Sequence, residues 1–131
     1  MSAVEPGAEL GPLRVTITRE QIAAYAEASG DRNPIHLDDG FARSVGLPGL
    51  IAHGMLDMAL LARLVVDWAG DHRRLRSLRC RFSGVVVPGD TLTCAGVVTR
   101  VDGGVAELEV WADNQDGKRV LGKGAARVSL E

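Results

Sequence analysis

The stretch HGMLDMALLARLVVDWA, residues 53–69, decides the fold of this chain. Apolar side chains recur on nearly every side of the helix that this stretch would form, and only Arg63 and Asp67, spaced i and i+4, mark a polar edge. A helix that is apolar almost all round is a buried one. We therefore predict a long central helix from about His53 to Ala69, covered by the rest of the chain.

The residues after Gly70 change from a helical period to the twofold period of strands. Leu78, Cys80 and Phe82 alternate with polar residues, as they do in a strand with one buried face. Short polar turns separate the apolar runs that follow, and this spacing predicts a meander of antiparallel strands. The strands are expected over residues 78–87, 91–101, 105–112 and 118–130, with turns at 88–90, 102–104 and 113–117.

The residues before the central helix predict shorter elements. Thr18 and Gln21 have the spacing of a capping box, which starts a helix. Asp38 is placed to cap a second, short helix, which Gly46 ends. Along the chain we expect a loose lead-in over residues 1–11, a short strand over 13–17, the first helix to about 28, an irregular segment over 30–36, the short helix over 38–46 and a turn over 47–49.

Together these elements predict an α+β fold, with one domain spanning residues 1–131. In this fold an antiparallel β-sheet wraps around a long central α-helix. A sheet that wraps a single helix covers only one of its own faces, and its edge strands leave backbone groups unpaired. Both features favour the association of two chains, so we expect a dimer.

Composition argues against several classes of function. Hydrophobic residues make up 46% of the 131 residues and charged residues 24%, an ordinary balance for a globular protein. The net charge of −2 argues against general nucleic-acid binding. No apolar run approaches the roughly 18 residues of a membrane span, and residues 1–11 lack the apolar core of a signal peptide, so the cytoplasm is the expected compartment. Cys80 and Cys94 are expected to be buried thiols rather than a disulfide or a zinc site.

The segment Ser29-Gly30-Asp31-Arg32-Asn33-Pro34-Ile35-His36 carries the candidate chemistry. Asn33-Pro34 stops a helix between the Asp31 carboxylate and the His36 imidazole, because the residue before a proline is pushed out of the α region. Two titratable groups held on one short, bent segment are well placed to bind one water molecule. Gly54, at the start of the central helix, leaves a backbone N–H free where the helix dipole favours negative charge. The pattern predicts an acid/base pair with an oxyanion donor.

These residues resemble the MaoC-like family, which has the hot-dog fold and includes (R)-specific enoyl-CoA hydratases and (3R)-hydroxyacyl-thioester dehydratases. The hydratase motif of that family is an aromatic residue, a few small residues, then Gly-Asp-x-Asn-Pro-aliphatic-His, with an alanine six positions later. Here these are Tyr25, residues 28–36 and Ala42, and His53-Gly54-Met55 at the head of the central helix also matches. One position differs from the pattern of the family: some of its hydratases carry a serine on the central helix, where this sequence has Ala62.

The resemblance implies reversible hydration of a trans-2-enoyl thioester to a (3R)-hydroxyacyl thioester. Asp31 and His36 would hold and deprotonate the water, with the roles of base and acid left open between them, and the Gly54 N–H would stabilise the enolate-like oxygen. Four neighbours would bind substrate or shape the site: Asn33, Pro34, His53 and Met55. No metal or organic cofactor is expected, because the thioester itself acidifies C2, and coenzyme A or phosphopantetheine arrives as part of the acyl-CoA or acyl-carrier-protein substrate.

The sequence leaves other functions open. A hot-dog thioesterase would need a carboxylate on the central helix, and Asp57 is the one candidate. A non-enzymatic thioester-binding subunit should lack Asp31 or His36, so we expect a catalytic chain. We expect it as a homodimer, or as the active half of a heterodimer with a second hot-dog subunit. A metal site made from Asp31, His36, Asp38 and His53 fits no common ligand spacing.

Two further features have an ordinary structural interpretation. The five arginines of residues 73–81 suit a loop and the solvent face of a strand, although they would also suit the phosphates of coenzyme A or an acidic carrier protein. Met55, Met58 and the leucines of the central helix are assigned to the core rather than to an acyl pocket, although a few of them would serve both. His72, beside Asp71 and Arg73, is expected to be exposed.

Overall fold

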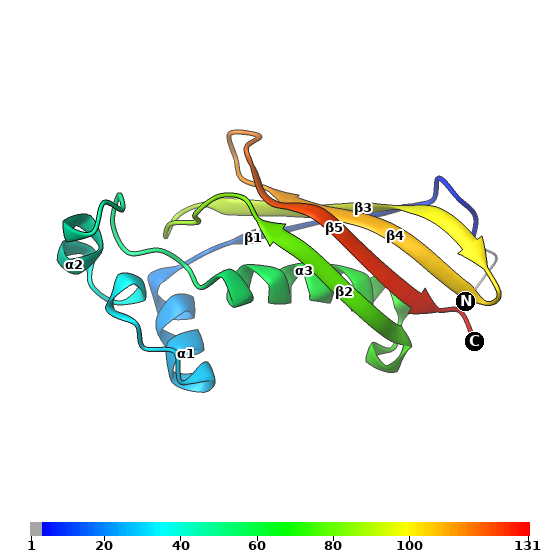
Figure 1. Ribbon diagram of the computed structural model, residues 1–131, viewed down its shortest axis with the longest axis horizontal. Coiled ribbons are helices and arrows are strands. Elements are labelled where there is room, and N and C mark those ends of the chain that lie inside the picture. The colour runs from blue at the N-terminus through cyan, green and yellow to red at the C-terminus, as the bar shows by residue number, and fades with distance from the viewer. Residues whose placement is uncertain (1–3) are drawn as a thin grey trace.

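The computed structural model describes residues 4–131 and consists of a five-stranded sheet laid across a long helix. The strand order is β1-β3-β4-β5-β2, and every neighbouring pair is antiparallel. Figure 1 shows α3 along the sheet, with α1 and α2 near one end of it. The predicted α+β architecture is confirmed. The strands are β1 Glu9–Thr16, β2 Leu75–Phe82, β3 Thr91–Asp102, β4 Val105–Asp113 and β5 Arg119–Ser129, and the helices are α1 Arg19–Ser29, α2 Asp39–Ser44 and α3 Gly54–Ala69, with short 3-10 helices η1 Pro34–His36 and η2 His72–Arg74.

The start of α1 is fixed by its predicted capping box. The Thr18 hydroxyl accepts a hydrogen bond from the Gln21 backbone N–H at 3.1 Å, and the Gln21 side-chain oxygen accepts one from the Thr18 N–H at 3.4 Å. α1 ends at Gly30, whose φ of 77° is a left-handed conformation that glycine adopts without a steric penalty. The chain therefore turns sharply just before Asp31.

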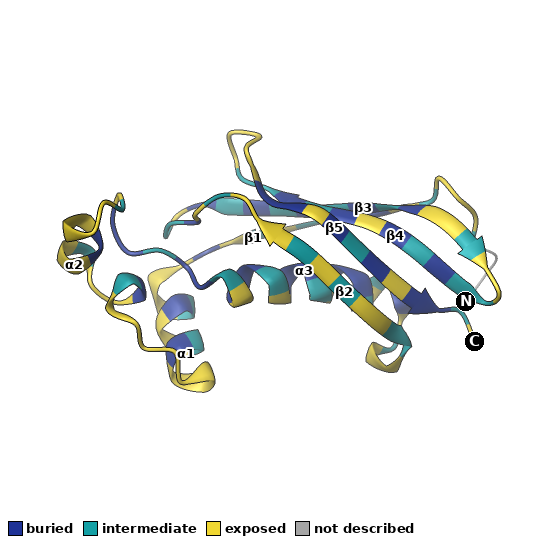
Figure 2. Ribbon diagram, in the orientation of Figure 1, coloured by how far each residue is buried: buried dark blue, intermediate teal, exposed yellow. Residues whose placement is uncertain are grey.

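The core lies between α3 and the sheet. From Thr91 to Val98 the side chains of β3 alternate between half-buried and buried, and on α3 Leu61 and Val65 are fully buried. Figure 2 shows this pattern as alternating dark and light bands along the strands. Arg63 and Asp67, which mark the polar edge expected from the sequence, are exposed and form an ion pair with 3.6 Å between nitrogen and oxygen.

The helix α3 is buried on one side only, which corrects the prediction of a helix covered all round. The outward side keeps an apolar stripe of exposed or half-buried residues: Met55, Met58, Ala59, Ala62 and Val66. Met55 is 56% exposed, so its assignment to the core is wrong. The sequence is apolar on the outward side as well as the inward side, and one chain has a single sheet with which to cover it.

The first strand is longer than predicted. β1 starts at Glu9 rather than Leu13, because Leu10 is 2% exposed and packs in the core. The register of β1 on β3 shifts between Leu10 and Leu13, so the pairing is interrupted there and then resumes. The predicted lead-in over residues 1–11 is therefore wrong from Glu9 onward, and its residues 1–3 lie outside the described part of the chain.

The second strand is shorter than predicted, since β2 ends at Phe82 rather than Val87. The backbone beyond it finds other partners. The Val86 carbonyl accepts a hydrogen bond from the Ala52 N–H at 2.7 Å, and the Val87 N–H donates to the Asp90 carboxylate at 3.0 Å. The chain thus leaves the sheet after Ser83, whose N–H still donates to the Val120 carbonyl of β5. Val86 then bonds to the loop that precedes α3, and Gly89 and Asp90 bond to Ile17.

The state of the two cysteines and the length of the helices can be compared with what the sequence predicts about disulfides and membrane spans. Both cysteines are free thiols, with Cys94 buried as expected and Cys80 only half-buried. Over residues 4–131, no helix has both the length and the apolar character that crossing a bilayer would require.

Candidate active site

The segment that carries Asp31 and His36 is held by side-chain to backbone hydrogen bonds. The Asp31 N–H donates to the Ser29 hydroxyl at 3.1 Å, and the Asn33 N–H donates to Asp31 Oδ1 at 3.2 Å. Asn33 Oδ1 in turn accepts from the Ile35 N–H at 3.2 Å and caps η1, in which Pro34 is the first residue. Asn33 and Pro34 therefore set the path of the backbone between the two titratable groups.

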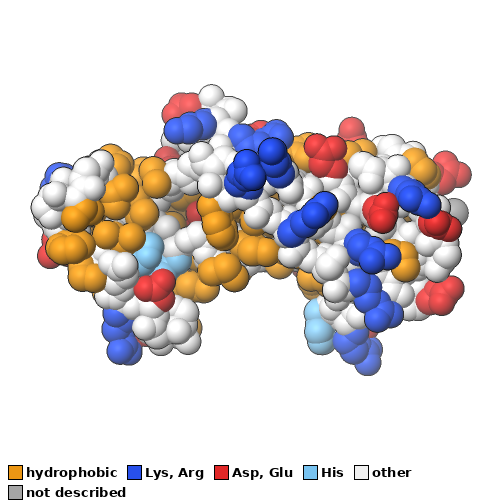
Figure 3. Space-filling view, in the orientation of Figure 1, with side chains coloured by type: hydrophobic (Ala, Val, Ile, Leu, Met, Phe, Trp, Pro, Cys, Tyr) orange, Lys and Arg blue, Asp and Glu red, His pale blue; other side chains and the backbone are white. Residues whose placement is uncertain are grey.

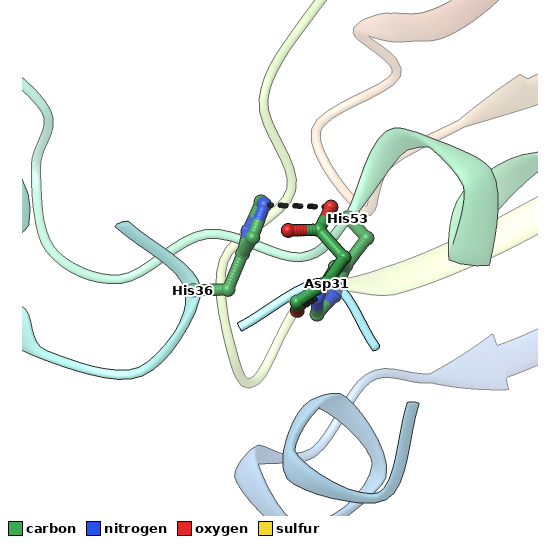
Figure 4. Close-up of side chains that lie close together, drawn as sticks. All are labelled: Asp31, His36 and His53. Atoms are coloured by element: carbon green, nitrogen blue, oxygen red, sulfur yellow. Dashed lines mark hydrogen bonds and ion pairs between the residues drawn. The ribbon is translucent and has the colours of Figure 1, made fainter. Parts of the chain in front are cut away.

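His36 is held in one tautomer by the backbone. The residue is 8% exposed, and its Nδ1 lies 2.7 Å from the carbonyl oxygen of Ile51. A carbonyl oxygen can only accept, so Nδ1 carries the hydrogen and Nε2 keeps its lone pair. Nε2 faces the Asp31 carboxylate, as Figure 4 shows.

Asp31 and His36 approach each other without forming a direct hydrogen bond. The distance from His36 Nε2 to Asp31 Oδ2 is 3.9 Å. That is too long for a hydrogen bond between the two groups, and a polar gap of this kind is one that a water molecule can bridge. The Asp31 side chain is 54% exposed, whereas that of His36 is 9% exposed, so the gap is open on the Asp31 side.

His53 supports both members of the pair. Its ring stacks on the His36 ring, with centroids 3.8 Å apart and an interplanar angle of 23°. His53 Nε2 lies 2.9 Å from the backbone carbonyl oxygen of Asp31 and must carry the hydrogen, because the carbonyl can only accept. The ring of Tyr25 packs on the other side of His53 at 4.8 Å. These contacts would let His53 shape the site, the role expected of it from the sequence.

A cleft of about 490 Å³ runs beside these residues. Its walls include Asp31, His53 and Gly54, together with Phe82 and Met55. Gly54 is the first residue of α3, and its N–H has no intrahelical carbonyl to bond. A Cβ on Gly54 would lie 3.1 Å from the Phe82 ring, so the closeness of the two walls depends on glycine. A larger hollow of about 680 Å³ lies on the sheet between β2, β4 and β5, but neither Asp31 nor His53 lines it.

A cation site is a poor fit to this arrangement. Asp31, His36 and His53 each offer a ligand atom, and these atoms lie within 4.8 Å of one another. The two imidazoles are stacked, however, so their lone pairs lie in two nearly parallel planes that are separated by the stack, and they do not converge on one point. Asp38, the fourth candidate, instead accepts from the Phe41 N–H at 3.0 Å and caps α2.

The sequence matches the family described as MaoC like domain over residues 2–117. The chain belongs to this family. The fatty acid synthase beta subunit TOXC of Cochliobolus carbonum is 41% identical to this MaoC-like chain over 103 residues, which make up 75% of the chain and 5% of that protein. The chain thus spans only a small part of the length of the curated relatives that it matches.

Solved structures resemble the MaoC-like chain over its full length. The (R)-hydratase from A. caviae involved in PHA biosynthesis superimposes with a TM-score of 0.89 at 29% identity, covering 100% of both chains. A chain of the ChsH1-ChsH2 complex from Mycobacterium tuberculosis superimposes with a TM-score of 0.87 at 27% identity, again covering 100% of both chains. The predicted family and hot-dog fold are confirmed.

A second carboxyl group of the MaoC-like chain also lines the cleft. Asp57, on the first turns of α3, is 3% exposed, and its Oδ1 has no hydrogen-bond partner within residues 4–131. Burial, with a smaller contribution from the Asp90 carboxylate, raises the pKa of Asp57 from 3.8 to about 7. In the sequence, Asp57 stands out as the polar residue on the inward face that Leu60, Leu61 and Leu64 share, but that pattern does not reveal that it lacks a partner.

Proposed function

We propose that this chain catalyses the reversible addition of water to a trans-2-enoyl thioester, giving a (3R)-hydroxyacyl thioester. The observation that carries the proposal is the 3.9 Å gap between His36 Nε2 and Asp31 Oδ2, at the edge of a cleft with a free helix N-terminus in its wall. The likeness to the (R)-hydratase from A. caviae supports the same chemistry and the same stereochemical course.

The tautomer of His36 favours it as the base. A water molecule between the two groups donates one hydrogen bond to His36 Nε2 and one to Asp31 Oδ2. Nε2 takes a proton as the water oxygen attacks C3, and the imidazolium is stabilised by the Ile51 carbonyl and the Asp31 carboxylate. The imidazolium then returns a proton to C2, so both groups end as they began. Such acid–base assistance is worth about 10²–10⁴-fold in rate.

The Gly54 N–H is the proposed donor to the thioester oxygen. As water adds at C3, negative charge collects on that oxygen, and a donor at the N-terminus of α3 stabilises it. The thioester then lies with its carbonyl at Gly54 and its acyl chain in the cleft. Metal and organic cofactors have no step in this mechanism, because the thioester itself makes C2 able to accept and lose a proton.

Replacement of Gly54 by alanine tests this placement. We expect Gly54→Ala to lower kcat/KM by about 10- to 100-fold, because the new methyl group pushes Phe82 and the bound carbonyl out of line. Gly84→Ala is the matched control, because it adds a methyl group to the wall of the same cleft away from the start of α3, and its Cβ would meet Val120 at an ordinary 3.5 Å. Adding Phe82→Ala to Gly54→Ala should restore part of the loss. Steady-state kinetics in which Gly54→Ala and Gly84→Ala behave alike would contradict the placement.

The direct test of the function is the loss of enoyl-thioester absorbance with crotonyl-CoA and with a longer trans-2-enoyl-CoA. Chiral analysis of the product should give the (3R)-hydroxyacyl thioester. The alternative is thioester hydrolysis, for which Asp57 in the cleft is the observation. Release of free thiol from saturated acyl-CoA, without loss of the enoyl absorbance, would favour that alternative and contradict the proposal.

The acyl group of the proposed substrate is carried by either coenzyme A or a carrier protein. Arg76, Arg79 and Arg81 on β2 are exposed, and within residues 4–131 none of them forms an ion pair. Arg81 precedes Phe82, which lines the cleft. We propose that these arginines contact the phosphates of the carrier, in keeping with the suitability of guanidinium groups for phosphate.

We also propose that a second hot-dog chain, in the simplest case another copy, covers the apolar surface beside the cleft. β2 ends the sheet with a free edge, and the outward side of α3 is apolar. Figure 3 shows hydrophobic side chains gathered over the end of the molecule that holds the cleft and α2. The exposed large apolar residues are Leu37, Phe41, Val45, Met55, Phe82 and Val85. The likeness to the ChsH1-ChsH2 complex supports either a homodimer or a heterodimer.

Light scattering during size-exclusion chromatography tests the homodimer. We expect the wild-type chain to have twice its monomer mass of 13.9 kDa. Phe41→Glu combined with Val45→Glu should shift it towards the monomer, because two buried charges oppose association. Thr99→Glu, on an exposed site of β3, is the control and should leave the mass unchanged. A wild-type monomer that dimerises only with a second hot-dog chain would point to the heterodimer instead.

A further inference from the structure

Asp57 is a buried carboxyl group that the proposed mechanism does not use. It is 3% exposed and lines the same cleft as Asp31 and Gly54. Its Oδ1 is fully enclosed and lacks a hydrogen-bond partner in the part of the chain that the structure describes, residues 4–131. A buried polar atom without a partner destabilises the folded chain, so such atoms are rare in native structures and call for an explanation.

No donor within residues 4–131 lies at hydrogen-bond distance from Asp57 Oδ1. The titratable groups that interact electrostatically with Asp57 are the Asp90 carboxylate and the thiols of Cys80 and Cys94, and the pKa values of both thiols are raised. Asp90 is already occupied: it accepts from the Val87 N–H at 3.0 Å and from the Gln115 amide at 2.8 Å. Of the two carboxyl oxygens only Oδ1 is fully enclosed. Oδ2 has no hydrogen bond within residues 4–131 either, and because Asp57 lines the cleft, Oδ2 is the oxygen to which a ligand there would supply the missing partner.

We infer that Asp57 recognises a hydroxyl group on the acyl chain of the substrate, beyond the reacting double bond. The inference rests on the proposed function for the position of the thioester at Gly54. Asp57 lies three residues further along α3, which is close to one turn and roughly 5 Å of helix. That distance corresponds to about four or five carbon atoms beyond the carbonyl.

A hydroxyl group fits this site better than a charged group does. The cleft is lined mainly by apolar side chains such as Ile51, Val86 and Phe82, and its other carboxylate, Asp31, is placed at the proposed reaction centre. An ammonium group beside Asp57 would therefore lose its hydration for a single charged partner. A hydroxyl needs one acceptor, and the Asp57 carboxyl can accept in either protonation state. A plain alkyl chain would leave Asp57 unpartnered, so the site should discriminate against it.

Binding of unreactive thioesters tests the inference without requiring hydration. Isothermal titration calorimetry would compare hexanoyl-CoA with 6-hydroxyhexanoyl-CoA on the wild-type chain. We expect the hydroxylated thioester to bind about tenfold more tightly or better. Asp57→Leu should abolish or reverse the preference, whereas Asp57→Asn, which keeps an acceptor oxygen, should retain most of it. Asp67→Leu, which removes an exposed carboxylate from the same helix, is the matched control and should bind both thioesters as the wild type does.

The outcomes separate this inference from the proposed function. Equal affinities of the wild type for the two thioesters, or a preference that survives in Asp57→Leu, would overturn the hydroxyl site even if trans-2-hexenoyl-CoA is hydrated. A wild type that prefers the hydroxylated thioester through Asp57 but does not hydrate trans-2-hexenoyl-CoA would support the site and contradict the hydratase. Binding of neither thioester would count against both.

Discussion

Asp31→Asn and His36→Ala are each expected to lower the hydration rate of crotonyl-CoA by about 10²–10⁴-fold. His36→Ala removes the one nitrogen whose lone pair faces the gap, so no group remains there to take the proton from water. Asp31→Asn keeps the size of the side chain but removes the charge that orients the water and stabilises the imidazolium. The measurement is kcat and KM from the enoyl-thioester absorbance, with the fold of each variant verified by circular dichroism.

Two exposed residues provide matched controls for these substitutions. His72→Ala removes an imidazole that is 82% exposed, and Asp67→Asn removes a carboxylate that is 63% exposed on the outside of α3. Both controls should keep the wild-type rate. The loss in Asp31→Asn and His36→Ala should fall on kcat more than on KM, since the pair acts on the transition state. A folded His36→Ala that keeps wild-type kcat would remove His36 from the mechanism.

The parts of the site that could be predicted from sequence are those that form within a few residues. Asp31 and His36 come together because Asn33 caps η1 through the Ile35 N–H and Pro34 opens it. The same holds for the α1 start at Thr18, whose partner is three residues away. Local hydrogen bonds of this kind follow from residue type and spacing, so the motif was sufficient to predict that Asp31 and His36 lie close together.

The rest of the site depends on contacts between distant segments. The tautomer of His36 follows from the Ile51 carbonyl, and the Asp31 backbone is held by His53, 22 residues further along the chain. The end of β2 at Phe82 likewise depends on a hydrogen bond between Ala52 and Val86. No periodicity signals these pairs, because each requires the sheet and α3 to be in place first.

Asp57→Leu is expected to make the folded chain more stable at pH 8, by about 2–4 kcal/mol in the free energy of unfolding. The pKa of Asp57 is raised by burial, and to a smaller degree by Asp90, from 3.8 to about 7. A shift of about three units is worth up to about 4 kcal/mol against the ionised folded state. A buried carboxyl group without its ligand lowers the stability of the folded chain, which function can require. Substitution by leucine removes that destabilisation.

The pH dependence of the stability gained in Asp57→Leu distinguishes the removal of a buried, titrating carboxyl from an improvement in packing. Between pH 3.8 and about 7 the folded chain holds a proton on Asp57 that the unfolded chain has released. That contribution to wild-type stability is therefore complete below pH 3.8 and is lost as the pH rises to about 7. The advantage of Asp57→Leu should be small in urea unfolding at pH 4, grow up to pH 7 and then level off. Asp67→Leu should show no such trend, because Asp67 is exposed. An Asp57→Leu advantage that is constant across this range would show that packing alone is responsible, and that Asp57 titrates normally in the folded chain.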